Sequence, residues 1–270
     1  MTSDGNSNRD SYRDSDRNFD DLAHRFRNRI YGGLKGDIRL AVLNRDLAPL
    51  LADAATLKIV DAGGGQGQFA LDLAEAGHSV YLADISAEML DLAAERVAER
   101  QLQRRVTLLH RRLQELPEIA ELQGADLVIC HAVLEWLAQP KRAVAQLRSL
   151  LKPGGYLSLT FYNRRALEFR LLQRGSFRQL DRNIDSDHWG GHPGSLTPQN
   201  PLLLEWVQDW LAQSGLNVVA HSGIRCFHDF MTPSIREKLP AAAIVEKELE
   251  YSRVDPYRQL ARYVHLLCRL

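Results

Sequence analysis

The fold is decided by Lys58-Ile59-Val60-Asp61-Ala62-Gly63-Gly64-Gly65-Gln66-Gly67, where a short apolar run leads directly into a cluster of glycines. The apolar run predicts a buried strand at Lys58–Asp61, and the residues that follow predict a helix at about Gln68–Ala76. Glycines between a strand and a helix allow a sharp turn and a close approach to a ligand, because no Cβ stands in the way. The stretch therefore indicates a strand–loop–helix unit with a ligand site at its turn.

The rest of the chain repeats this alternation of apolar runs and helical patterns, which is typical of βαβ units. Further strands are expected at Ser79–Ala83, Val106–His110, Leu127–Cys130, Tyr156–Phe161, Asn217–Ile224 and Tyr263–Arg269. Helices are expected at about Ala87–Arg100, Lys141–Leu151, Leu202–Gln213 and Ala241–Tyr251. Ser86 is placed to cap the first of these helices, and Lys152-Pro153-Gly154-Gly155 is placed to end the second and turn the chain. We predict an α/β fold with a doubly wound, mostly parallel, seven-stranded Rossmann-like sheet.

Two segments lie outside this regular series. Residues 1–17 are polar, with few apolar side chains, and are expected to be a disordered tail. Amphipathic helices are expected at about Phe19–Ile30 and Lys35–Leu51, before the first strand. Residues 162–200 interrupt the later part with one arginine-rich helix, at about Arg164–Arg174, and a loop with several glycines and prolines. We expect one domain over residues 18–270, in which residues 18–53 and 162–200 form a cap over the substrate.

Composition excludes several classes of protein. The 270 residues include 34 Lys and Arg against 34 Asp and Glu, so any polyanionic partner has to be held by a local basic patch. The three cysteines lie far apart without metal-ligand spacing, which argues against a disulfide framework and predicts no metal. No apolar run approaches the roughly 20 residues that span a bilayer. These features indicate a cytoplasmic protein with no membrane partner.

Two nucleotide ligands compete for the glycine loop. The dinucleotide fingerprint G-x-G-x-x-G, started at Gly63, needs a glycine where Gln68 stands. An acidic strand end followed by packed glycines suits a nucleoside without a pyrophosphate, so we favour S-adenosylmethionine over NAD. A tight turn that binds nothing stays an alternative. Asp84 ends the next strand about 20 residues later, where a carboxylate accepts both ribose hydroxyls in either kind of site.

Other candidates follow from the rule that ligands bind at the carboxyl ends of parallel strands. Leu113 and Gln114 follow the third strand and are expected at the adenine. His131 follows the fourth strand and is expected at the methionine end, although an isolated histidine is equally often structural. Arg39, on the helix before the sheet, is a candidate for the methionine carboxylate, but its spacing fits a solvated helix face better.

The sequence says less about the methyl acceptor than about the cofactor. Methyl transfer from a sulfonium requires alignment and a dry path more than acid–base catalysis, since the donor is already activated. A carboxylate acceptor, with a pKa of about 4, needs no base at neutral pH, so no residue is assigned as catalytic acid or base. His131-Ala132-Val133-Leu134 stands where amino-group methyltransferases carry an Asn-Pro-Pro-Tyr-type motif, which indicates an oxygen or carbon acceptor.

Basic side chains gather near the N-terminus, between Arg25 and Arg39, and again between Arg164 and Arg182. Most such runs are solvated helix faces. Because these two flank the expected substrate entrance, a phosphate-rich partner is an equally good interpretation. The candidates for RNA contact are Arg164, Arg165, Arg170 and Arg174.

Several longer blocks resemble a known family. They are Arg17-Asn18-Phe19-Asp20-Asp21, Ile30-Tyr31-Gly32, Lys35-Gly36 with Arg39, Asp61–Gly65, Asp84, His131–Trp136, Phe161-Tyr162-Asn163, Phe227-His228-Asp229 and Arg262–His265. From about Arg17 to the C-terminus the chain resembles the bacterial tRNA 5-carboxymethoxyuridine methyltransferases, a class I S-adenosylmethionine-dependent family. The resemblance implies methylation of the carboxylate of 5-carboxymethoxyuridine at the tRNA wobble position, giving the methyl ester, with the anticodon stem-loop as partner.

For the site, the resemblance implies cofactor contacts from Arg39, Gly63, Gly64, Asp84, Leu113, Gln114 and His131. Polar groups in the same blocks are the candidates that position the substrate: Tyr31, Lys35, Asn163 and His228. The segment 181–197 departs from the family, because it carries acidic residues where a more basic run is expected. Two alternatives stay open, a small-molecule O-methyltransferase of the same fold and a non-catalytic module that binds RNA or a protein.

Overall fold

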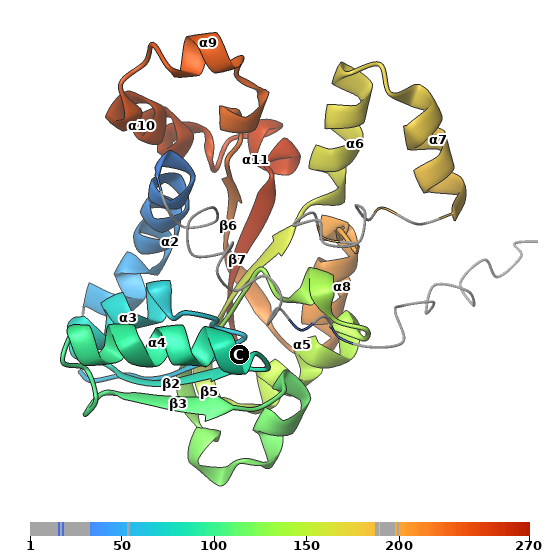
Figure 1. Cartoon of the computed structure of the whole chain (residues 1–270). Helices are drawn as coiled ribbons and strands as arrows, with labels where there is room; N and C mark the ends of the chain where they lie inside the picture. The colour runs from blue at the N-terminus through green and yellow to red at the C-terminus, as the bar shows by residue number, and fades with distance from the viewer. Residues whose placement is uncertain are drawn as a thin grey trace, which may run out of the picture.

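The computed structural model describes Asp16, Asn18, Trp189, Pro198 and residues 33–52, 55–186 and 200–270 (Figure 1). Its strands are β1 (Lys58–Ala62), β2 (Ser79–Asp84), β3 (Val106–His110), β4 (Ala125–His131), β5 (Leu151–Tyr162), β6 (Asn217–Ile224) and β7 (Tyr263–Arg269). Its longer helices are α2 (Leu34–Ala52), α3 (Gln68–Glu75), α4 (Ala87–Glu99), α5 (Pro140–Ser149), α6 (Arg164–Gln173), α7 (Phe177–Ser186), α8 (Leu204–Gln213) and α10 (Ala241–Tyr251). Short helical turns are η2 (Leu113–Glu118), η3 (Ala120–Leu122), η4 (Leu134–Trp136), η5 (His228–Phe230), α9 (Pro233–Arg236) and α11 (Tyr257–Leu260). The helix predicted at Phe19–Ile30 lies outside the described residues.

The seven strands form one sheet in the order β3-β2-β1-β4-β5-β7-β6. Strands β1 to β5 pair in parallel, and β7 runs antiparallel to both of its neighbours, β5 and β6. This confirms the doubly wound, mostly parallel sheet. The winding reverses between β1 and β4, and ligands in such sheets bind beside that switch point, at the carboxyl ends of the strands.

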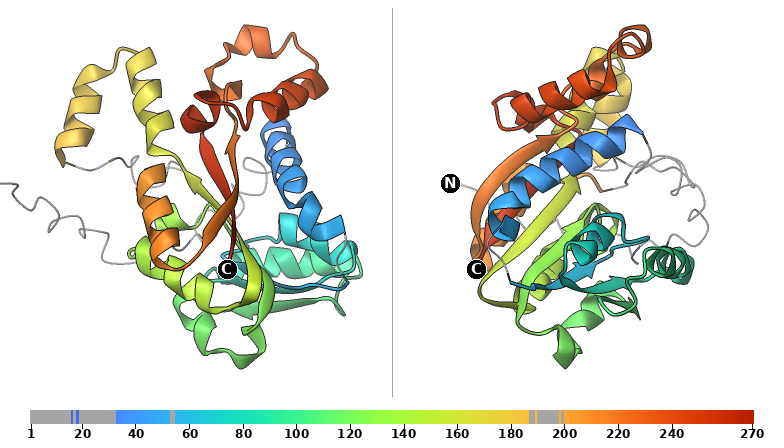
Figure 2. Two further views of the ribbon diagram at one scale, coloured as in Figure 1. Left: turned by 180° about the vertical axis from the view of Figure 1, so that it is seen from behind. Right: turned by 90° about the vertical axis from the view of Figure 1, so that its left-hand side faces the viewer.

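Helices cover both faces of the sheet, and each face has its own apolar core (Figure 2). On one face, α5 and α8 bury Val144, Leu147 and Leu211. On the other face, α2, α3, α4 and α10 pack, and Ile38 and Val42 of α2 are fully buried. Because both faces are covered, the central strands are continuous apolar runs, which is why the sequence pattern located them.

The position of α2 corrects one expectation about the cap. Residues 18–53 were expected to cover the substrate, yet the part described as α2 packs lengthwise on the sheet and contacts α10, β6 and β7. Its apolar stripe repeats at helical spacing, so it is buried by the sheet itself. Residues 34–52 therefore belong to the core layers.

The residues expected to end the helix and turn the chain, Lys152–Gly155, lie in a bulge near the start of β5. Helix α5 ends at Ser149, as expected, and β5 begins at Leu151. Leu151 pairs with Ala125 of β4, but the next pair is Tyr156 with Leu127, so the residues between them have no partner in β4. Gly154 has a φ of +74°, which is left-handed and not extended. Gly154 N donates to Leu270 O at 3.2 Å, and Leu270 N donates to Gly155 O at 3.0 Å, so the end of the chain holds this bulge.

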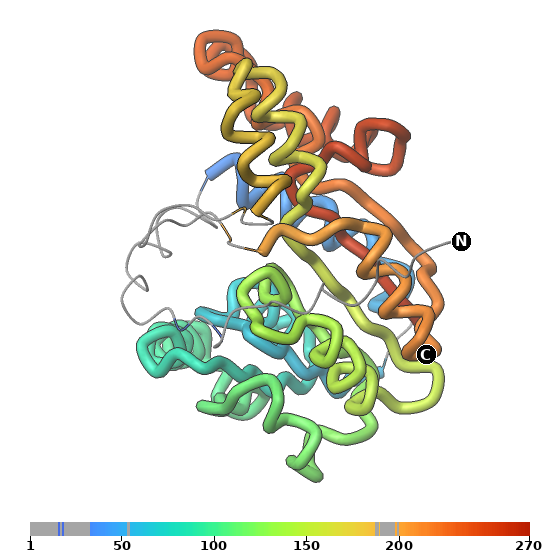
Figure 3. The backbone as a smooth tube through the Cα atoms, turned by 90° about the vertical axis from the view of Figure 1, so that its right-hand side faces the viewer, coloured from blue at the N-terminus to red at the C-terminus, as the bar shows by residue number. Residues whose placement is uncertain are grey.

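The insertion after β5 contains two helices where one was expected. α6 and α7 lie on either side of Gly175, so residues 181–186 of the segment expected as a loop at 181–197 are helical. The rest of that segment, apart from Trp189, lies outside the described residues. Figure 3 shows α6 and α7 at the same end of the molecule as α9, α10 and α11. This end is the one to which the carboxyl end of β5 points.

Candidate active site

The loop after β1 is shaped by hydrogen bonds to the end of β2. The amides of Gly63 and Gly64 both donate to Ala83 O, at 2.8 and 3.1 Å. Gly63 has a φ of +78°, and a Cβ on Gly64 would lie 2.5 Å from Asp61 Oδ2. A side chain at either position would strain the loop or displace a neighbour, so glycine is required here by the structure as well as by access to a ligand.

Asp84, at the end of β2, fixes the same loop from the other side. Its Oδ2 accepts from Gly65 N and its Oδ1 accepts from Ser86 N, both at 2.8 Å. Ser86 Oγ in turn accepts from Met89 N at 3.2 Å, which confirms the predicted cap of α4. A carboxylate offers about four acceptor sites, so Asp84 retains capacity for a ligand.

These loops open onto a cavity at the carboxyl ends of the strands, where ligands of such sheets bind. It is lined by all the residues that were expected around the cofactor: Arg39, Gly63, Gly64, Asp84, Leu113, Gln114 and His131. Sequence reasoning missed further lining residues, namely Asp16, Met89, Trp136, Leu137 and Tyr263. Trp136 and Tyr263 do fall in the family-like blocks, so the resemblance carried a signal for them that residue spacing did not.

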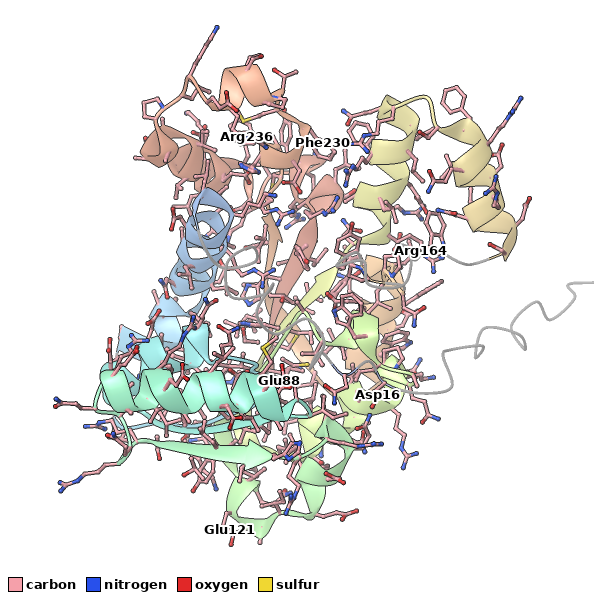
Figure 4. The ribbon with its side chains drawn as sticks, viewed as in Figure 1. Asp16, Glu88, Glu121, Arg164, Phe230 and Arg236 are labelled. Carbon is pink, nitrogen blue, oxygen red and sulfur yellow. The ribbon has the colours of Figure 1, made fainter. Side chains whose placement is uncertain are left out.

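Asp16 belongs to residues 1–17, the segment expected to be a disordered tail, and is the one residue of that segment that the structure describes. Its Oδ2 accepts from Gln114 Nε2 and its Oδ1 accepts from Ala138 N, both at 2.8 Å (Figure 4). The polar composition of the tail could not reveal this position, because the two donors lie about a hundred residues further along the chain. Asp16 thus contributes a second carboxylate to the cavity wall.

His131, at the end of β4, belongs to a buried chain of hydrogen bonds. Its Nε2 lies 2.8 Å from Ser158 Oγ, Ser158 Oγ lies 3.0 Å from His265 Nε2, and His265 Nδ1 lies 2.7 Å from Asp46 Oδ2. Burial opposes the charge of Asp46, but the hydrogen bond from His265, the charge of His265 and that of Arg45 hold the Asp46 pKa well below its usual range. Asp46 is therefore an ionised acceptor at the far end of the chain.

This chain couples the protons of the two histidines. Because a carboxylate only accepts, His265 Nδ1 donates to Asp46. The Ser158 hydroxyl has one proton, so it donates to one of the two Nε2 atoms and accepts from the other. Burial, together with the charges of His265 and Arg39, lowers the pKa of His131 well below its usual value. When Ser158 accepts from His131 Nε2, the neutral imidazole has an acceptor at Nδ1, which suits an ammonium group at this wall of the cavity.

Arg39 reaches the cavity from α2 and is only 4% exposed. Its guanidinium carbon lies 4.8 Å from the centre of the Tyr263 ring, which is a cation–π arrangement. The solvated helix face that its spacing suggested is therefore wrong, because α2 turns this side toward the sheet. A buried cation in the cavity wall suits a carboxylate ligand.

Behind the glycine loop lies a buried carboxyl group. Burial raises the pKa of Asp61 to about 7, and the charge of Asp84 adds to this effect. Asp61 therefore exchanges a proton near neutral pH. A positively charged ligand close to these two acids favours their ionised forms.

The cavity fits S-adenosylmethionine. Gln114 Oε1 is buried and has no hydrogen-bond partner among the residues that the structure describes, so it can accept from an adenine amino group. The glycine loop offers a backbone that a ligand can approach, and Met89, Leu113 and Leu137 supply apolar surface for a base. Together with Asp84, these groups match a nucleoside with a charged tail.

The residues expected to position the substrate have different surroundings. Asn163 is 1% exposed and caps α6, and its amide nitrogen donates to two main-chain carbonyls just before β7. His228 is 2% exposed, and its Nδ1 lies 3.0 Å from Asp229 Oδ1. Both side chains are used by the protein itself, which assigns them structural roles. Lys35 is exposed near the start of α2, and Tyr31 lies outside the described residues.

The arginines expected to contact RNA also separate into two groups. Arg164 is held between two tryptophan rings, at 4.5 and 4.9 Å from their centres, and Arg165 forms an ion pair with Glu168 at 2.9 Å. Arg170 is partly buried and Arg174 is exposed. Arg164 thus has a structural role, while Arg170 and Arg174 remain candidates for contact with a polyanion.

Comparison with known proteins identifies the family. Residues 60–159 match a family model described as a methyltransferase domain. Over 256 residues the chain is 36% identical to the tRNA 5-carboxymethoxyuridine methyltransferase of Escherichia coli strain K12. The aligned region covers 94% of this chain and 96% of that protein. The chain belongs to the tRNA 5-carboxymethoxyuridine methyltransferase family. The resemblance inferred from the motif blocks is confirmed.

Other methyltransferases share the fold with this family. The ubiquinone biosynthesis O-methyltransferase of Xanthomonas axonopodis pv. citri (strain 306) is 29% identical over 52% of this chain and 55% of that protein. The crystal structure of magnesium protoporphyrin IX methyltransferase from Synechocystis PCC 6803, with bound SAH, has a TM-score of 0.60 at 18% identity, covering 93% of this chain and 95% of that one. This chain is an S-adenosylmethionine-dependent methyltransferase, and S-adenosylmethionine is its cofactor.

Three further features of the described residues bear on partners. No group of three or more His, Cys, Asp or Glu side chains within the described ranges is arranged to hold a metal ion. In the same part of the chain, no helix is long and apolar enough to cross a bilayer. Cys130, Cys226 and Cys268 are buried free thiols.

Proposed function

We propose that this chain methylates the carboxylate of 5-carboxymethoxyuridine at the wobble position of tRNA, giving the methyl ester. The observation that carries the proposal is the 36% identity, over nearly the whole chain, to an Escherichia coli protein named for that nucleoside. The methyltransferase domain at residues 60–159 would not by itself specify an acceptor, because one fold serves many substrates. The similarity extends to the segments outside that domain, where an acceptor has to be recognised.

The chemistry requires orientation more than proton transfer. When bound, S-adenosylmethionine would supply a methyl group on a sulfonium, and an ionised carboxylate oxygen would attack the methyl carbon in line with the departing sulfur. A carboxylate with a pKa of about 4 carries its charge at neutral pH, so the protein does not have to remove a proton. The task of the side chains is to hold both reactants in line and to exclude water.

Each proposed cofactor contact comes from a different segment of the sheet edge. Asp84 accepts the ribose hydroxyls, and Gln114 accepts the adenine amino group through its buried Oε1. His131 accepts the ammonium of the methionine end, while Arg39 binds the carboxylate of the same end. Because β2, η2, β4 and α2 are packed on one sheet, these groups are fixed relative to one another before any ligand enters.

A small-molecule O-methyltransferase is the second candidate function. The ubiquinone biosynthesis O-methyltransferases support it, but they match only about half of this chain. The intact glycine loop and Asp84 weigh against a non-catalytic binding module, because both belong to the cofactor cavity. The basic residues beyond that cavity favour an acidic acceptor over a neutral phenol.

The test of the proposed function is transfer of labelled methyl groups to tRNA that carries the free acid. We expect label that mild alkali releases, because an ester hydrolyses where methyl groups on ring atoms or ethers do not. Matched tRNA without the acid should take up no label, and Asp84→Ala protein should transfer little. Alkali-stable label would point to another acceptor, and label in a small phenol but not in tRNA would support the second candidate.

A further inference from the structure

Beyond the cofactor cavity, basic side chains from separate segments converge on two tyrosine rings. The guanidinium carbon of Arg262 lies 4.8 Å from the centre of the Tyr162 ring, and that of Arg225 lies 5.7 Å from the centre of the Tyr263 ring. The two rings meet edge to face at 5.4 Å. Two more cations are close enough to interact with these arginines electrostatically. We call this group the basic cluster: Lys35 of α2, Arg170 of α6, Arg225 after β6 and Arg262 before β7.

The basic cluster is a direct neighbour of the cofactor cavity. Tyr263 lines that cavity, and Arg39 stacks on its ring at 4.8 Å while Arg225 lies 5.7 Å from the same ring. Tyr162 ends β5 and Tyr263 begins β7, so both rings stand at the sheet edge where β4 presents His131. A group bound at the basic cluster is therefore separated from the cofactor by little more than one aromatic side chain.

Two arginines of the basic cluster share one acid, Asp229, within the described part of the chain. Asp229 forms an ion pair with Arg225 and lies 3.7 Å from Arg262. Burial opposes its charge, but the hydrogen bond with His228 and the two arginines hold the pKa of Asp229 well below its usual range. One carboxylate offsets one of the four positive charges. The cluster therefore carries excess positive charge at neutral pH.

The cations repel one another in the free protein. Partial burial and the charge of Arg225 lower the pKa of Lys35, and burial and the charge of Arg262 lower the pKa of Arg170. Like charges held together are unfavourable, and a bound anion relieves the repulsion. Figure 4 shows the two sides of this region, α6 beginning at Arg164 and the segment that carries Phe230 and Arg236.

Buried polar atoms at the same place lack partners. Tyr162 is 1% exposed, and its hydroxyl makes no hydrogen bond to any residue that the structure describes. Within the same residues, the Nε atoms of Arg225 and Arg262 are also buried without a hydrogen bond. Buried donors normally have acceptors, so three open donors beside an excess of positive charge indicate a ligand with anionic oxygens.

We propose that the basic cluster and the Tyr162 hydroxyl form the anion site for the acceptor nucleotide. The ligand is an oxygen anion of that nucleotide, either the carboxylate on its base or a phosphate of its backbone. This inference rests on the proposed function, which supplies the acidic nucleotide. Guanidinium groups bind both kinds of anion through paired N–H donors, so their shared chemistry fits the site equally well.

The two sources differ after the reaction. When a carboxylate oxygen forms its bond to the methyl carbon, the bond from that carbon to sulfur breaks, and both the acid and the sulfonium lose their charges. A site that holds the carboxylate must therefore bind the free acid more tightly than the ester. A site that holds a phosphate must bind both forms alike.

The test compares two anticodon stem-loop RNAs, one with the free acid and one with the methyl ester, bound to protein saturated with S-adenosylhomocysteine. Arg262→Gln and Arg170→Gln should each weaken binding of the acid RNA about tenfold or more, because each removes a charge-assisted contact. Arg148→Gln, on the exposed side of α5, is the matched control and should change affinity less than about twofold. Cofactor affinity by calorimetry should stay unchanged in all three, which shows that the fold is intact.

Two patterns support the site and identify its ligand. If it binds the carboxylate, wild-type protein prefers the acid RNA and the two cluster variants lose that preference. If it binds a phosphate, the variants weaken binding of both RNAs equally. The slope of the logarithm of the binding constant against the logarithm of the salt concentration then becomes shallower by roughly 0.7 for each lost contact. Unchanged affinity of Arg170→Gln and Arg262→Gln for both RNAs would overturn the inference. Wild-type protein that does not methylate the acid RNA would instead refute the proposed function.

Discussion

Ser158 Oγ lies between two histidines, 2.8 Å from His131 Nε2 and 3.0 Å from His265 Nε2. Through it, the carboxylate of Asp46 on α2 is linked by hydrogen bonds to His131, which lines the cofactor cavity. Such outer partners fix the orientation and tautomer of a histidine that contacts a ligand. Ser158 is thus a positioning residue.

Ser158→Ala should weaken binding of S-adenosylmethionine by roughly threefold to tenfold, since one buried hydrogen bond contributes about 1 kcal/mol. Calorimetry measures the affinity, and ¹⁵N NMR of His131 reports its tautomer, which a purely structural role of Ser158 would not alter. Ser149→Ala is the control, because that exposed hydroxyl bonds only to Gln146 O. Unchanged cofactor affinity together with an unchanged His131 tautomer would show that Ser158 does not position His131.

Asp84→Ala should reduce cofactor affinity a hundredfold or more. The variant loses two ribose hydrogen bonds to a charged acceptor, each contributing roughly 1.5–3 kcal/mol, as well as the bonds that hold Gly65 and Ser86. Asp91→Ala removes an exposed carboxylate of α4 and should leave affinity unchanged. Equal cofactor affinities of the two variants, measured by calorimetry, would show that Asp84 does not bind the cofactor.

Asp61 should make the fold less stable as the pH rises. Its pKa is about 7 in the folded protein and about 4 in an unfolded chain, so between these values the folded state holds the extra proton. Its contribution is fully present below about pH 4 and is lost as the pH rises through about 7. Relative to Asp61→Asn, the wild type should lose a few kcal/mol at most over this window, at about 1.4 kcal/mol per pKa unit.

Urea unfolding of both proteins at about pH 5 and about pH 8 measures this difference. Titrating groups that do not interact with Asp61 contribute equally to both proteins and cancel in the comparison. Parallel pH profiles of wild type and Asp61→Asn would show that Asp61 is ionised throughout the folded state.

Arg164→Ala should lower stability by about 1–3 kcal/mol without weakening RNA binding, because its guanidinium packs between Trp189 and Trp206. Arg174→Ala should weaken RNA binding and leave stability unchanged, since this arginine is exposed beside Arg170. Chemical denaturation and salt-dependent RNA binding separate the two effects. If Arg164→Ala lost RNA affinity at unchanged stability, Arg164 would be a residue that contacts RNA after all.

Local sequence was sufficient for the parts of the molecule that depend on nearby residues. The central strands appear as apolar runs because both faces of the sheet are covered there, and the cap at Ser86 follows from a bond to Met89 three residues away. The glycine loop is likewise a local feature, set by the φ of Gly63 and the space beside Gly64. For these elements, pattern and structure coincide.

Other features depend on partners far along the chain. Asp16 is held by Gln114 and Ala138, and Asp46 meets His265, 219 residues later. Arg39 looked solvated because its helical spacing does not reveal that α2 lies flat on the sheet. No local pattern encodes such contacts. The contacts of Asp16, the hydrogen-bond chain from Asp46 to His131 and the basic cluster are therefore visible only in the folded structure.

The central claim is that a carboxylate of 5-carboxymethoxyuridine accepts the methyl group. Mass spectrometry of nucleosides tests it most directly, using tRNA that carries the free acid, incubated with the protein and S-adenosylmethionine. The account predicts that the acid nucleoside disappears as its methyl ester appears, and that neither change occurs with Asp84→Ala. Persistence of the free acid, with active protein and bound cofactor, would contradict the claim.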